Sequence, residues 1–108
     1  METRQINEYI DSWRKFEIMA LIFIQQCKDE ISLSDLARKI GISPTHRYFH
    51  YVIGVLIDFG GVKSIREIAG TKLIKLDLNR IGELLYECDP YFKISEKIIA
   101  ERRLLYKI

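Results

Sequence analysis

Polar and aromatic side chains that can form hydrogen bonds are concentrated in segment 44–51. Arg47 carries a guanidinium fork that can bind bidentately to guanine O6 and N7, or to a phosphate group. Thr45, His46 and Tyr48 can donate hydrogen bonds to phosphates or to base edges. These residue types in one short segment therefore favour contact with double-stranded DNA. The candidate DNA-contacting residues are Pro44, Thr45, His46, Arg47, Tyr48, His50 and Tyr51.

The same segment also fits a simpler interpretation, in which its polar residues are an ordinary solvated helix face. Tyrosines pack well at the edges between helices, so Tyr48 and Tyr51 could equally be structural.

A second group of basic residues lies between positions 62 and 78. Such side chains can contact the DNA backbone or enter the minor groove, but they can also protect an exposed β-edge from aggregation. The candidates here are Lys63, Arg66, Thr71, Lys72 and Lys75. Ser34 and Arg38 are candidate phosphate contacts. Ser34 also suits a helix N-cap, and Arg38 an exposed helical charge.

Nothing in the chain predicts catalysis, and we expect neither an enzyme nor a bound cofactor or metal. His46 and His50 are four residues apart, but no Cys, Asp or Glu follows at a metal-ligand spacing. Gly60 and Gly61 follow a predicted helix and precede a predicted strand, the reverse of a phosphate-binding glycine loop. We interpret the two histidines as polar groups on a helix.

Segment 33–44 predicts a helix, a tight turn and the start of a second helix. Leu36, Ala37 and Ile40 share one apolar face, with Ser34 as the expected N-cap. Gly41 ends the helix where a left-handed backbone is easily adopted only by glycine. Ser43 and Pro44 then suit the N-cap and first residue of the next helix. This is the helix-turn-helix pattern, whose second helix enters the major groove.

The rest of the chain predicts further helices and one hairpin. Apolar residues at helical spacing in segment 5–28 predict one long helix or two short ones, and Ile31 a minimal strand. Helices over 34–40 and 44–59 come next, the second with a buried stripe from Phe49 to Phe59. Alternating residues with a turn at Gly70 predict a β-hairpin over 62–78. A helix capped by Asn79 and ending near position 88 precedes a last helix over 91–108.

The order of these elements resembles the winged-helix transcription regulators of bacteria and archaea, broadly the MarR and ArsR type. The resemblance covers roughly residues 18–85, and it is strongest over 35–43, 59–62 and 78–85. The chain differs from these regulators in the second helix of the helix-turn-helix, which is longer than usual and contains Gly54. The resemblance implies a mainly α fold with a small β-hairpin: one winged helix-turn-helix domain over 1–108, with flanking helices in 1–30 and 79–108. It also implies a sequence-specific DNA-binding transcription regulator, a dimeric repressor.

Composition agrees with a folded intracellular protein. The 108 residues are 48% hydrophobic and 30% charged, which excludes a disordered chain, and the net charge of +2 permits nucleic-acid binding without demanding it. We expect no membrane span and no signal peptide, hence a cytoplasmic protein. Cys27 and Cys88 lack metal spacing, and we expect them as reduced, core-facing residues, with a disulfide as the alternative.

Excess apolar residues near both ends of the chain predict a homodimer, since two flanking helices need more cover than a small domain offers. The alternative is a monomer whose last helix folds back on the first. A winged helix could also serve as a protein–protein adaptor without specific DNA binding. A small-molecule effector is compatible with the sequence but not indicated by it. The candidate dimer residues are Ile6, Tyr9, Ile10, Trp13, Tyr91, Ile94, Ile98, Leu105 and Ile108.

Overall fold

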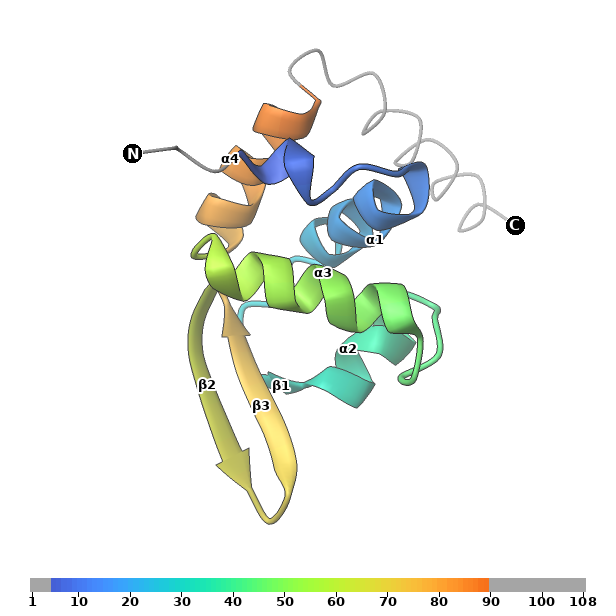
Figure 1. Cartoon of the computed structure of the whole chain (residues 1–108). Helices are drawn as coiled ribbons and strands as arrows, with labels where there is room; N and C mark the ends of the chain where they lie inside the picture. Colours follow the sequence, from blue (N-terminus) through green and yellow to red (C-terminus); the bar gives the residue numbers. More distant parts are fainter. Residues whose placement is uncertain (1–4, 90–108) are drawn as a thin grey trace, which may run out of the picture.

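The computed structural model describes residues 5–89, which fold into helices and a small antiparallel sheet (Figure 1). The result is a mixed α/β arrangement, compatible with a small α+β domain. The elements, in order, are η1 (Ile6–Glu8), α1 (Trp13–Ile24), β1 (Ile31–Ser32), α2 (Leu33–Lys39), α3 (Arg47–Asp58), β2 (Val62–Ile68), β3 (Thr71–Leu76) and α4 (Leu78–Cys88).

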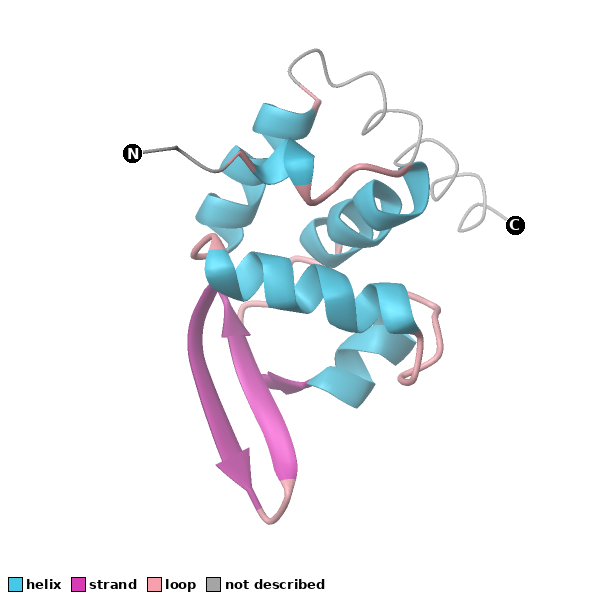
Figure 2. Cartoon of the chain, in the orientation of Figure 1, coloured by secondary structure: helices cyan, strands magenta, loops and turns pink. Residues whose placement is uncertain are grey.

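The expected hairpin is present as β2 and β3, and the minimal strand at Ile31 is present as β1. The sheet order is β1-β3-β2. Ile74 on the central strand β3 lies opposite Ile31 of β1 and opposite Ile65 of β2. The register shifts between Val62 and Ser64. Because β1 is only two residues long, most of the hairpin extends beyond the helices as a two-stranded ribbon (Figure 2).

The hairpin turn consists of Ala69 and Gly70, both with positive φ, at 51° and 80°. This combination belongs to the tight two-residue turns that match the twist of a hairpin. Glycine adopts it without a steric penalty, whereas the Cβ of Ala69 is strained there.

The core lies between the helices and the inner face of the sheet. The predicted inner face of α2 is confirmed, since Leu36, Ala37 and Ile40 are all buried. Gly41 has the expected positive φ of 81°. The α3 stripe is also confirmed, with Phe59 partly buried at its end. The buried members of that stripe are Phe49, Val52, Ile53 and Leu56.

Segment 5–28 forms two helices, the 3-10 helix η1 and then α1, which is the second of the two predicted alternatives; the Ser12 side chain accepts from the Lys15 N–H at the start of α1. Two expected helix caps were wrong. Ser32, not Ser34, caps α2 by accepting from the Asp35 N–H. Likewise the N-cap of α4 is Asp77 rather than Asn79.

The predicted start of α3 was also wrong, because Ser43 is not its N-cap and Pro44 is not its first residue. His46 is the N-cap, and Arg47 is the first helical residue. The Ser43 hydroxyl instead accepts from the Thr45 N–H at 3.3 Å and bonds the Thr45 hydroxyl at 2.9 Å. These side-chain bonds stabilise a turn that competes with an earlier helix start.

Among residues 5–89, no helix is both long and apolar enough to cross a membrane. The helix expected over 91–108 lies outside the described residues, and so do five of the candidate dimer residues: Tyr91, Ile94, Ile98, Leu105 and Ile108.

Candidate nucleic-acid interface

Helix α3 presents one line of exposed residues opposite its buried stripe. Arg47, His50, Tyr51 and Gly54 follow one another at helical spacing and are all exposed. Gly54 has open space around it, since a Cβ built there would meet nothing within 4 Å. This stretch is therefore a polar surface that a ligand can approach closely.

Arg47 stands at the beginning of that line and is held by its neighbour Tyr48. Its Nη2 donates to the Tyr48 hydroxyl at 3.3 Å, and its Cζ lies 5.0 Å from the centre of the tyrosine ring. Arg47 forms no ion pair with any residue in 5–89. The stacked guanidinium therefore keeps N–H donors available for a guanine edge or a phosphate.

His46 and His50 hold the start of α3 rather than presenting both ring nitrogens to a ligand. His46 Nδ1 accepts from the Tyr48 N–H at 3.2 Å, which caps the helix. His50 Nε2 donates to the Pro44 carbonyl at 2.6 Å. Direct base contacts by these nitrogens, which the sequence suggested, would require breaking those bonds. Both histidines therefore stabilise the turn that leads into α3, where Arg47 is the first helical residue.

Tyr48 and Tyr51 pack against the N-terminal part of the chain, as the structural alternative anticipated. The Tyr51 hydroxyl donates to the Tyr9 carbonyl at 2.9 Å. The Lys15 ammonium lies 4.4 Å from the Tyr51 ring centre and 5.8 Å from that of Tyr48. Lys15 also pairs with Asp11 at 2.8 Å, and their mutual bond lowers the pKa of Asp11 and raises that of Lys15. These contacts fix α3 relative to α1.

The hairpin carries basic residues whose surroundings differ. Lys63, Lys72 and Lys75 are exposed and form no ion pair within residues 5–89. Lys72 lies opposite Glu67 near the exposed Thr71 at the tip. The lysines are therefore available to an anionic partner.

Arg66 is different, because its guanidinium pairs with Glu30 in the loop before β1. Arg66 Nε donates to Glu30 Oε2 at 2.7 Å, and Nη2 donates to Oε1. The hydrogen bond between them raises the pKa of Arg66 and lowers that of Glu30. The candidate DNA contact at Arg66 is thus engaged within the molecule.

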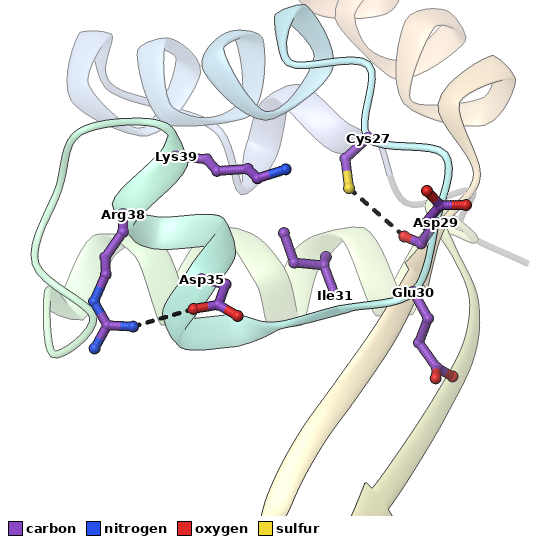
Figure 3. A pocket seen from close by; sticks show the side chains of 7 residues that line it. All are labelled: Cys27, Asp29, Glu30, Ile31, Asp35, Arg38 and Lys39. Carbon is purple, nitrogen blue, oxygen red and sulfur yellow. Dashed lines mark hydrogen bonds and ion pairs between the residues drawn. The ribbon is translucent and has the colours of Figure 1, made fainter.

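The two phosphate candidates on α2 are exposed but not equivalent. Ser34 lies in the first turn, where Ser32 already provides the cap. Arg38 Nη1 is 3.2 Å from Asp35 Oδ1, in a surface ion pair (Figure 3). Arg38 lines a cavity of about 450 Å³ whose other side chains include both acidic and basic groups, whereas Ser34 does not line it. A mixed lining gives no strong preference for an anion.

The cysteines are free and half-buried. Cys27 Sγ donates to the Asp29 carbonyl at 3.6 Å (Figure 3). Burial, with Glu87 and Asp89 nearby, raises the pKa of the Cys88 thiol to about 11, so it is protonated at neutral pH. Across residues 5–89, no three His, Cys, Asp or Glu side chains gather closely enough to hold a metal ion.

The four N-terminal candidates for dimer contact divide into two pairs. Ile6 and Ile10 are buried in the chain's own core, which takes the place of the partner surface expected for them. Tyr9 is partly buried, with its ring 5.6 Å from that of Phe59. Trp13 is 45% exposed at the start of α1. Of these four residues, Tyr9 and Trp13 are the two that offer surface to a second copy.

The sequence analysis did not identify Glu30 or Lys15 as site residues. Glu30 binds the Arg66 guanidinium, and Lys15 lies over the rings of Tyr48 and Tyr51. Glu30 and Arg66 are 36 residues apart, and no local pattern reports such a pair. The charge of Glu30 directly before a strand was the only available signal.

Comparison with protein families, curated proteins and solved structures gave no match to this chain.

Proposed function

We propose that this chain is a sequence-specific double-stranded DNA-binding transcription regulator with a winged helix-turn-helix architecture. Support comes from the order of α1, β1, α2, α3 and the hairpin, which is the order of that architecture. One observation carries the proposal. The exposed face of α3 begins with Arg47, a residue without an ion pair in the described chain, and a hairpin bearing three similarly available lysines extends from the same domain.

In this proposal α3 lies in the major groove and the hairpin reaches the flanking backbone. Arg47 reads a guanine edge, because a bidentate guanidinium contact discriminates between bases. Lys72, at the hairpin tip, contributes sequence-independent attraction to phosphate. Gly54 allows the middle of α3 to approach the duplex, since it has no side chain to keep the two apart.

The regulator acts as a homodimeric repressor in this proposal. A two-fold axis would place two α3 helices in successive major grooves of a palindromic site. Trp13 supports a contact between copies, because it is large, apolar and exposed beside a shallow cavity of about 270 Å³ that Phe16 also lines.

The test is fluorescence anisotropy with two duplexes, one of random sequence and one from the region upstream of the gene, over a series of salt concentrations. Arg47→Ala should cost roughly 1–3 kcal/mol on the upstream duplex and reduce its preference over the random one. Lys72→Ala should weaken binding to both duplexes equally and reduce the salt slope by about one.

Arg14→Ala is the matched control, since it removes the same charge from α1, where Arg14 pairs with Glu17. It should leave the sequence preference intact. Equal losses on both duplexes with Arg47→Ala would refute base reading by Arg47. Absence of salt-dependent duplex binding by the wild type would refute the whole proposal.

A second candidate function is a protein-interaction module without specific DNA binding. Three exposed isoleucines favour it: Ile57 on α3 is 40% exposed, and Ile65 and Ile68 on β2 are each 49% exposed. Apolar side chains on an edge strand are typical of a surface that pairs with another protein. A stable complex with a different protein, together with no duplex binding, would establish this function instead.

A further inference from the structure

Three lysines from separate parts of the sequence meet at the base of the hairpin. Lys28 follows α1, Lys63 is near the beginning of β2, and Lys75 is near the end of β3. All three line one cavity of about 330 Å³, together with Asp77 and Asn79 at the start of α4. Ammonium groups repel one another, so their convergence on one cavity is costly without a counter-charge.

The local backbone explains why these lysines face outward. Ile74 and Leu76 are buried against the core, so Lys75 between them belongs to the opposite face of the sheet. Lys63 occupies the shifted position between Val62 and Ser64, where the regular pairing with β3 is interrupted. No residue of α2 or α3 lines the cavity. It is therefore a surface separate from the exposed face of α3.

The charges at this cavity favour an anion. Lys28, Lys63 and Lys75 form no ion pair with any residue in 5–89. Asp77 contributes the one carboxylate of the lining, and its Oδ1 accepts from the Arg80 N–H at 3.1 Å as the cap of α4. Three ammonium groups and one carboxylate give the lining a net charge of +2, and the Glu30 carboxylate outside the lining also attracts Lys75. Asn79 adds an amide that can donate a hydrogen bond.

We propose that this cavity binds a phosphate group through Lys28, Lys63 and Lys75. Lysine ammonium groups act on phosphate as point charges that adjust their position along a flexible stem. The phosphate can come from a free phosphorylated small molecule or from the DNA backbone. Binding of the free molecule does not depend on the proposed DNA binding.

The test combines two titrations of the full chain, one with pyrophosphate and one with the duplexes described above. Pyrophosphate binding is followed by amide chemical shifts of Lys63, Lys75 and Asn79, with potassium chloride at matched ionic strength as reference. The variants are K28Q/K63Q/K75Q and, as control, K39Q, which neutralises an exposed lysine of α2 outside this cavity. Thermal unfolding of each variant shows that the fold is retained.

A free phosphorylated ligand is supported if pyrophosphate binds saturably with a Kd at or below about 1 mM. The triple variant should then weaken binding about tenfold or more, while K39Q leaves it unchanged. DNA is identified as the source if pyrophosphate does not bind but the triple variant weakens both duplexes equally. The proposal is overturned if the triple variant alters neither. Failure of the wild type to bind any duplex would refute the proposed DNA function, and the pyrophosphate result would still decide the phosphate site.

Discussion

The Arg66 guanidinium on β2 and the Glu30 carboxylate before β1 pair through two hydrogen bonds, with Nε to Oε2 at 2.7 Å. The pair spans the sheet, because β3 lies between β1 and β2. It therefore links the free-standing hairpin to the loop that leads out of α1. It also neutralises a basic residue that would otherwise add to the charge of the hairpin.

Glu30→Gln should release Arg66 and strengthen binding to random duplex. One more available cation should make the dependence of log K on log salt steeper by about 0.9. The same anisotropy series measures both quantities. Glu83→Gln is the matched control, because Glu83 pairs with Arg80 on α4, away from the hairpin. Equal changes in the two variants would indicate a general effect of net charge and contradict a specific role for Arg66.

The Glu30–Arg66 pair should also make folding stability depend on pH in the acid range. The bond from Arg66 holds the pKa of Glu30 below its ordinary value of 4.5. The stabilisation is therefore complete above that pH and is lost as the pH falls through the lowered pKa of the folded state. The Tm of the wild type should fall more steeply than that of Glu30→Gln between about pH 5 and pH 3. Parallel Tm curves for the two proteins would show that the pair does not contribute.

Gly54→Ala should raise the stability of the fold by about 0.5–1 kcal/mol, because Gly54 lies inside α3 and an added Cβ meets nothing within 4 Å. Gly82→Ala in α4 is the matched comparison. Its Cβ would lie 3.2 Å from Phe23 Cε2, so the same gain in helix propensity is offset by crowding. Urea unfolding of both variants measures the difference.

The same Gly54→Ala variant tests the approach of α3 to the duplex. If the backbone of α3 approaches the groove closely, the added methyl group should weaken duplex binding although the fold is more stable. Unchanged duplex affinity would mean that the middle of α3 is not in close contact with DNA.

Cys88 should be unreactive at neutral pH and should destabilise the fold in alkali. Burial raises its pKa to about 11 from an ordinary 9.0, so the folded protein has a roughly 100-fold smaller thiolate fraction than an unfolded chain at the same pH. Iodoacetamide should therefore modify Cys27→Ser protein slowly when folded and faster in urea. Above pH 9 the unfolded state loses its thiol proton first, so stability should fall until about pH 11. Equal rates in the folded and unfolded states would contradict this protection.

The sequence was a good guide where local chemistry decides the structure. The apolar spacing of Leu36 and Ile40, and the glycine at position 41, were enough to predict α2 and its end. It was a poor guide to where α3 begins, because the bond between Ser43 and Thr45 and the reach of His50 to Pro44 compete with helix formation there. Local patterns cannot rank such alternatives.

Contacts between distant positions were not predictable from local patterns. The pairing of Glu30 with Arg66 and the convergence of Lys28 with Lys63 and Lys75 depend on the register of the sheet. That register follows from the packing of the whole core, so a single sequence carries no short-range signal for it.

The hairpin has a consequence for the thermodynamics of any encounter with a ligand. From Lys63 to Lys72 every residue is exposed, and β1 supports β3 only at Leu73 and Ile74. A two-stranded ribbon with water on both faces is barely stable by itself. Its amide hydrogens should therefore exchange with solvent well before those of α1 or α3, through local opening that leaves the core intact. A partner that binds the ribbon must also offset the entropy that the ribbon loses on becoming ordered. Association should therefore show a large favourable enthalpy that is partly cancelled by an unfavourable entropy.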